Sequence, residues 1–209
     1  MKIKDLCKAA FILLLISTSS LGSDKSSTPK KLFSCLGDYA LCSSSICKVD
    51  GDTALCKCPI YSGKNLGGTT CKVRNNTAAS GTSVYSDYSP KFLTTENSKL
   101  FKPGLICTNT DNKKYTYADC FDVKCKVNKG SSDALCKCPI FTTTDSIQIQ
   151  SESCKESSKL CQYLAPNSKR VVVNSAPAVF GDRVIFEALR DEGKHFDPKT
   201  MLCHPKEQK

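Results

Sequence analysis

Cysteine is the residue type with the clearest chemical potential in this sequence, because a thiol can form a disulfide, bind a metal ion or act as a nucleophile. The chain of 209 residues contains 15 cysteines. Two Cys-x-Cys pairs occur, Cys56/Cys58 and Cys136/Cys138, without the Cys-x-x-Cys spacing typical of zinc knuckles. We therefore expect disulfides and no metal site.

The two histidines, His195 and His204, are the other residues that could do chemistry. His204 follows Cys203 directly, a pattern compatible with zinc binding or Cys-His catalysis. A bridged cysteine, however, is neither a ligand nor a nucleophile. The sequence also lacks a nucleophile elbow, a phosphate loop and an HExxH helix. We expect no catalytic residues and no cofactor; an enzyme, if the chain were one, would be a small hydrolase that uses one of these histidines.

The N-terminal residues predict secretion. A basic start, an apolar run over residues 9–16 and small residues up to Gly22 have the order of a signal peptide at residues 1–22. Its removal takes Cys7 away and leaves fourteen cysteines, an even number that suggests seven disulfides in an oxidising compartment. We expect an extracellular protein with no stable membrane insertion after cleavage.

Composition argues against a large single-core enzyme. The chain has no Trp and only 8% aromatic residues, so small units held by cross-links are more consistent with it. The formal net charge is +10, but the lysines are scattered along the sequence and form no run of five or six. This distribution favours a solvated surface, with weak attraction to anionic glycans as the alternative, and disfavours nucleic acid as a partner.

An internal duplication organises the chain. The heptapeptide Ala-Leu-Cys-Lys-Cys-Pro-Ile occurs at residues 54–60 and again at residues 134–140. Each copy carries six cysteines, and a hairpin is expected between the third and the fourth because Asp50-Gly51 in one copy and Gly130 in the other are turn signals. In our interpretation, Cys56 and Cys58 lie on opposite faces of a strand and find different partners, and Pro59 and Pro139 end the strands.

This arrangement of six cysteines, a hairpin and Cys-x-Cys resembles the epidermal-growth-factor-like (EGF-like) module, in two tandem copies. The fold class implied is small, disulfide-rich and made mainly of β hairpins. In that family the first cysteine pairs with the third, the second with the fourth and the fifth with the sixth. Carried over, the resemblance implies Cys35–Cys47, Cys42–Cys56 and Cys58–Cys71, and in the second copy Cys107–Cys125, Cys120–Cys136 and Cys138–Cys154. From the spacing alone, six cysteines allow 15 pairings. The acidic cluster of the calcium-binding subtype is missing before both copies, so no calcium site is expected.

The remaining segments are assigned from composition. We expect a flexible lead at 23–34, the repeats at 35–71 and 107–154, and between them a Ser/Thr-rich linker at 72–106 without packed elements. A small α+β segment at 155–209 holds Cys161 and Cys203, which by elimination should pair. Its strand is expected at 170–173, and Asp182 could cap a helix that follows.

These features predict a secreted binding or interaction protein that presents loops on disulfide-stabilised repeats. The candidate loops are Tyr61–Thr70 and Phe141–Ser153. The expected partner is an extracellular or surface protein, or a glycan. The alternative is a secreted inhibitor or toxin-like effector that acts on a host or prey protein through one such loop.

Overall fold

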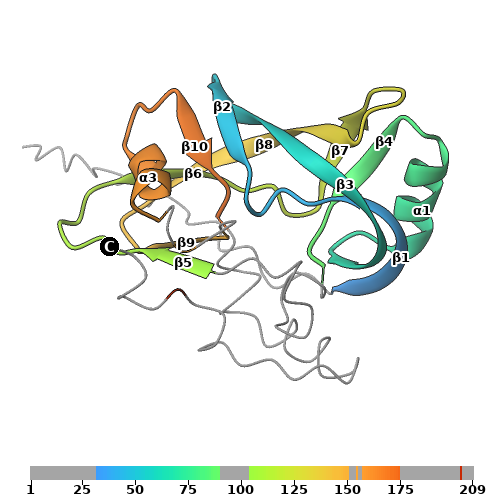
Figure 1. Ribbon diagram of the computed structural model, residues 1–209, viewed down its shortest axis with the longest axis horizontal. Coiled ribbons are helices and arrows are strands. Elements are labelled where there is room, and N and C mark those ends of the chain that lie inside the picture. Colours follow the sequence, from blue (N-terminus) through green and yellow to red (C-terminus); the bar gives the residue numbers. More distant parts are fainter. Residues whose placement is uncertain (1–31, 90–103, 151–153, 155–156, 175–202, 204–209) are drawn as a thin grey trace, which may run out of the picture.

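The computed structural model describes residues 32–89, 104–150, 154, 157–174 and 203. Within them the chain is mostly strand, cross-linked by seven disulfides (Figure 1). The elements are β1 Phe33–Ala40, β2 Ile46–Asp50, β3 Thr53–Gly67, α1 Cys71–Ala79, β4 Ser83–Ser86, β5 Gly104–Cys107, β6 Tyr115–Ala118, β7 Val123–Val127, β8 Asp133–Thr143, β9 Ile147–Gln150, α3 Ser157–Cys161, the 3-10 turn η3 Gln162–Leu164 and β10 Arg170–Val172. The signal peptide, His195, His204 and the helix after Asp182 lie outside the described residues.

Both predicted hairpins are present. β2 pairs with the first half of β3 and β7 with the first half of β8, in antiparallel register. Gly51 and Gly130 have φ angles of 64° and 77°, which a residue with a side chain rarely adopts and which these tight turns use. Each copy therefore folds locally as its turn residues indicate.

The strands do not end at the prolines, contrary to our expectation. β3 runs through Pro59 and β8 through Pro139, because both prolines lie where the strand changes its neighbour. The next residue supplies the hydrogen bond instead: the Ile60 amide donates to the Ser132 carbonyl over 2.8 Å. A missing N–H is thus tolerated at the end of the β3–β8 pairing.

The two copies are joined into one sheet by their identical heptapeptides. β3 and β8 are antiparallel, and Cys56 lies directly opposite Cys136. On one side of this cysteine pair Leu55 faces Lys137, and on the other side Lys57 faces Leu135. The same two residue types therefore face each other on both sides, with the two strands interchanged. This register creates a local two-fold relation between the copies.

The last strand of each copy crosses to the other copy. β4, from the first copy, pairs with β7 of the second, and β10, from the second, pairs with β2 of the first. The two pairings are equivalent, since Val84 lies opposite Cys125 and Val171 opposite Cys47. The central sheet therefore has the order β10-β2-β3-β8-β7-β4, with α1 beside β4 and α3 beside β10 at its two ends (Figure 1). The two copies thus exchange their last strands reciprocally within one chain.

The disulfides are nested, and the EGF-like pairing is wrong at every bridge that it implied. In the first copy the bridges are Cys35–Cys71, Cys42–Cys58 and Cys47–Cys56, and in the second copy they are Cys120–Cys138, Cys125–Cys136 and Cys107–Cys161. The physical reason is the hairpin: Cys47 and Cys56 lie on adjacent strands, and so do Cys125 and Cys136, with Cα atoms 4.3 Å apart in both cases.

The Cys-x-Cys residues have different partners, as expected, but not for the reason given. Residues two apart in a strand point to the same face, and Cys56 and Cys58 are both fully buried on the inner side of β3. They bond to different cysteines because their partners also lie at different positions along the chain. Cys56 bonds to Cys47, within β2, and Cys58 bonds to Cys42, before β2.

The outermost bridge of the second copy uses a different cysteine from the one expected. Cys107 pairs with Cys161 at the end of α3, and Cys154 pairs with Cys203, so the predicted Cys161–Cys203 bridge is wrong. Cys161 is the structural counterpart of Cys71. Cys71 follows β3, which pairs with the strand of Cys35, and Cys161 follows β9, which pairs with the strand of Cys107. The second repeat thus continues past residue 154.

The segment after Cys71 is packed, which corrects the expected linker at 72–106. α1 and β4 occupy residues 71–79 and 83–86, and Arg74 and Val84 are buried. The Ser-rich composition misled because Ser83 and Ser86 are buried strand residues here. The strand expected at 170–173 is confirmed by β10.

The disulfide pairing can be tested by peptide mapping without reduction. Trypsin cleaves after Lys57 and Lys137, and so separates the cysteines of each Cys-x-Cys pair. In the second copy we expect a peptide pair that joins Cys125 to Cys136, identified by mass spectrometry after free thiols are alkylated, which prevents thiol exchange. In the first copy one tryptic peptide holds Cys35, Cys42 and Cys47, and we expect it to be joined to the peptides of Cys56, Cys58 and Cys71. A separate peptide pair that joins only Cys58 to Cys71 would show instead that the family-like pairing is the real one.

Candidate functional site

The outer face of the central sheet carries an ordered set of basic side chains. Residues directly opposite each other in antiparallel strands point to the same face. The register therefore places two neighbouring rows on the side away from the disulfides. One row is Arg170, Lys48, Leu55 and Lys137; the other is Lys57, Leu135, Lys126 and Ser83. We call these two rows the basic face.

The basic face is exposed. Lys48, Lys57, Lys126 and Lys137 all have exposed side chains, while the inner residues of the same strands are buried. Leu135 is 46% exposed, a high value for a leucine in a sheet, and Leu55 is half-buried. Four cations therefore surround two apolar side chains on a flat surface.

The face follows the two-fold relation of the sheet and departs from it at its rim. Lys48 corresponds to Lys126, Lys57 to Lys137 and Leu55 to Leu135, and the residues are identical in each pair. At the rim, Arg170 corresponds to Ser83, and Asp133 occupies the place that Thr53 has in the other half.

Carboxylates reduce the charge of the face only in part. The Lys57 ammonium lies 3.0 Å from the Asp133 carboxylate, and the Lys57 side chain is 76% exposed, so the pair is a weak surface contact. Asp50 shares the face of Lys48 at the hairpin end of β2. Lys124, two residues before Lys126 on β7, adds a further exposed cation.

Sequence reasoning missed this face, because lysines that are scattered along the chain are gathered by the strand pairing. The signal was present: Lys48 and Lys126 alternate with the third cysteine of each copy, and Lys57 and Lys137 lie inside the Cys-x-Cys pairs. Alternation with buried cysteines places these lysines on the outer side of their strands. Only the β3–β8 pairing, however, brings the four together.

Beneath the face lie the sulfur atoms. The Cys42 and Cys136 sulfurs approach within 3.4 Å, and the Cys120 and Cys56 sulfurs approach within the same distance. The sulfurs of Cys42, Cys58 and Cys136 form one close group, and those of Cys47, Cys56 and Cys120 form another, each with spacing that a metal site could use. All six cysteines are bridged, so they offer no thiolate to a metal and act as core.

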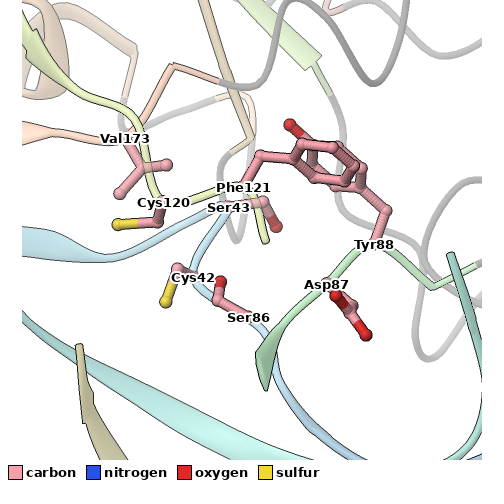
Figure 2. A pocket seen from close by; sticks show the side chains of 8 residues that line it. All are labelled: Cys42, Ser43, Ser86, Asp87, Tyr88, Cys120, Phe121 and Val173. Carbon is pink, nitrogen blue, oxygen red and sulfur yellow. The ribbon is translucent and has the colours of Figure 1, made fainter. Parts of the chain in front are cut away.

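A small hollow lies between the copies, lined by Cys42, Ser43, Ser86, Asp87, Tyr88, Cys120, Phe121 and Val173 (Figure 2). The rings of Tyr88 and Phe121 stack at its edge with their centroids 4.9 Å apart. Its volume of about 10 Å³ is close to the minimum for one water molecule. It is therefore too small for an organic ligand.

An ion pair is buried beneath α1. Arg74 and Asp87 are 3% and 1% exposed and form a direct salt bridge. The Arg74 guanidinium also donates to the Asn65 side-chain oxygen and to the Phe33 carbonyl, each over 2.8 Å. Gly67 allows this approach, since a Cβ atom there would lie 2.3 Å from an Asp87 oxygen.

The second copy fills the equivalent space with apolar side chains. Leu164 lies three residues after Cys161, as Arg74 lies three residues after Cys71, and it is fully buried. Ile147 lies opposite Cys107 as Asn65 lies opposite Cys35. The ion pair is thus a structural solution peculiar to one half rather than a site that the fold requires.

The ionisable groups of this region are tuned by burial. Loss of hydration raises the pKa of Asp87 to about 6, although Arg74 opposes the shift. One Asp87 oxygen, Oδ1, is buried without a hydrogen-bond donor, which agrees with that direction. Burial also raises the pKa of Tyr39 to about 12 and that of Tyr88. The Asp87 carboxylate pairs with the buried Arg74 guanidinium and the Asp87 amide donates to the Ala40 carbonyl, so we assign Asp87 a structural role.

The candidate display loops are strands for most of their length. Residues 61–67 belong to β3, while β8 and β9 contain residues 141–143 and 147–150. The expectation of loops there is wrong, because β1 and β6 pair with β3 and β8, and β5 pairs with β9. Residues 151–153 lie outside the described part of the chain.

No protein family model, curated protein or solved structure shows a significant match to the chain. Among the helices that the structure describes, none is long and apolar enough to cross a membrane. Function must therefore be argued from the surface itself.

The structural role of the ion pair can be tested with residues taken from the other copy. Arg74→Leu should lower the free energy of unfolding by about 3–5 kcal/mol, since the buried Asp87 carboxyl loses its cation and must either stay charged without a partner or take up a proton. Asn174 is the counterpart of Asp87, because its amide donates to the Ala118 carbonyl as the Asp87 amide donates to the Ala40 carbonyl, each over 3.0 Å. The double variant Arg74→Leu/Asp87→Asn therefore copies Leu164 and Asn174 and should recover most of that loss. Guanidinium unfolding with intact disulfides measures both; equal stability of the single and double variants would contradict the role.

The pH dependence of stability should report Asp87. Its pKa in the folded protein is raised to about 6, above the ordinary value, so the folded state binds a proton more tightly than the unfolded chain. The contribution of Asp87 to stability should therefore increase as the pH falls from about 6 towards 4. Asp87→Asn should remove this increment, measured as the difference between the two unfolding curves across that range. A difference that stays constant with pH would mean that the pKa is not raised.

Proposed function

We propose that the protein is a secreted, non-catalytic binding protein that uses the outer face of its central sheet as the contact surface. The observation that carries this proposal is the exposed basic face directly above four stacked disulfides. The seven disulfides are consistent with an oxidising, extracellular compartment. A surface held by cross-links loses little conformational freedom on binding, which favours affinity for a given contact area.

The form of the surface differs from the display of loops that the sequence suggested. A sheet face presents side chains at fixed intervals, about 5 Å between strands and about 7 Å along a strand. Such a surface suits a partner with repeating chemical groups better than a single inserted loop would. The alternative of an inhibitor or toxin-like effector rested on the loops, and no described residue now favours it.

The proposal predicts native binding without turnover. The disulfide-intact protein, immobilised on beads, should retain material from an extracellular fraction, and the reduced and alkylated protein should not. Retained material should elute chemically unchanged, as judged by mass spectrometry. Equal retention by both forms would contradict the proposal, and so would cleavage of the retained material.

A further inference from the structure

We propose that the basic face binds an anionic polysaccharide that bears sulfate or carboxylate groups. This inference rests on the proposed function and adds the partner class to it. It begins from the geometry: Lys48 and Lys137 lie in one row, two strands apart, and Lys57 and Lys126 lie in the next row with the same separation. Each separation is about 10 Å at the spacing of β-strands.

The charges act together. Neighbouring cations of the two rows are separated by about one Debye length or less at physiological salt, roughly 8 Å, so their potentials add. Arg170 extends the positive area to β10 at one end of the sheet, and Lys124 adds a second cation on β7, while Asp133 and Asp50 offset only part of the positive charge. The basic face forms a band across the strands, and a linear polyanion lying along this band would meet a cation at most strands.

Identity between the copies supports a role for this face. The duplicated halves have diverged elsewhere: the exposed Ile46 corresponds to the exposed Lys124, and the exposed Arg170 corresponds to the buried Ser83. Lys48, Lys57 and Leu55 nevertheless have identical counterparts in the second copy, although an exposed lysine on a sheet has no packing role. Retention of exposed residues in both halves indicates that the surface itself is used.

The residue types favour a glycan over other polyanions. The four central cations of the face are all lysines, and a lysine is a point charge that can contact the single anionic oxygens spaced along a polysaccharide. The two rows contain no aromatic side chain on which a nucleic-acid base could stack, and Tyr85, which lies opposite Lys124 on β4, is half-buried. Leu55 and Leu135 lie between the lysines rather than beyond them, so they can contact the C–H face of a sugar ring but do not form an anchor for a lipid layer.

The test compares two double variants with the same change in net charge. Lys48→Glu/Lys126→Glu alters the basic face, and Lys72→Glu/Lys159→Glu alters exposed lysines on α1 and α3. The probes are heparin, uncharged dextran, single-stranded DNA and vesicles that contain phosphatidylserine. Isothermal titration at about 0.15 M NaCl measures the Kd, and intact mass together with near-UV circular dichroism confirms the fold of each variant.

We expect the wild type to bind heparin and not dextran, and the face variant to bind heparin at least about tenfold more weakly than the control variant. The single substitutions Lys48→Glu and Lys126→Glu should each weaken binding, and by less than the double variant, because each removes one cation from its own row. Equal affinity of the face and control variants would overturn the inference. Tighter binding of the DNA or the vesicles than of heparin would also overturn it. The proposed function would survive either result if the native protein still retained its extracellular partner.

Discussion

The contact between disulfides of the two copies is the constraint on which the rest of the structure depends. Cys56 and Cys136 lie opposite each other in the β3–β8 register, and each sulfur touches a bridge from the other half. Four disulfides therefore fill the centre of a chain that has no Trp and few aromatic residues. Small neighbours are needed for this packing, and Ala40, Ala54, Ala118 and Ala134 supply them. The covalent core takes the place of the large apolar side chains found in ordinary domains.

The exchange of strands follows from the same arrangement. Once β3 and β8 are paired, β2 and β7 become the outer strands, and each would expose a free edge. β10 and β4 cover these edges, each arriving from the opposite copy. Away from the axis the halves no longer need to agree, and they do not: Arg74 and Asp87 stand where the other half has Leu164 and Asn174. The two-fold relation is strict along β3 and β8 and relaxed towards the ends of the sheet.

The part of the fold that sequence could predict is the local part. Turn glycines identified both hairpins, and the strand character of residues 170–173 identified β10, because these signals act between neighbours in the chain. The β3–β8 pairing was hidden, since two identical heptapeptides carry no mark that they pair with each other. The disulfides were hidden for a related reason: Cys154 and Cys161 both follow the second hairpin, and spacing does not distinguish them. The basic face depends on the hidden pairing, so it could not be seen from the sequence.

The packing of the core restricts the inner positions of β3 and β8 and not their outer positions. On β3 and β8 the inner positions are occupied by alanine and bridged cysteine, and a change there would disturb the sulfur packing. The outer positions of the same strands have no such constraint, yet Leu55 and Lys57 reappear as Leu135 and Lys137. Packing explains the cysteines and the alanines but not these residues. The proposed contact with an extended anionic partner would explain them, because a positively charged sheet held by its own cross-links loses little conformational freedom on binding.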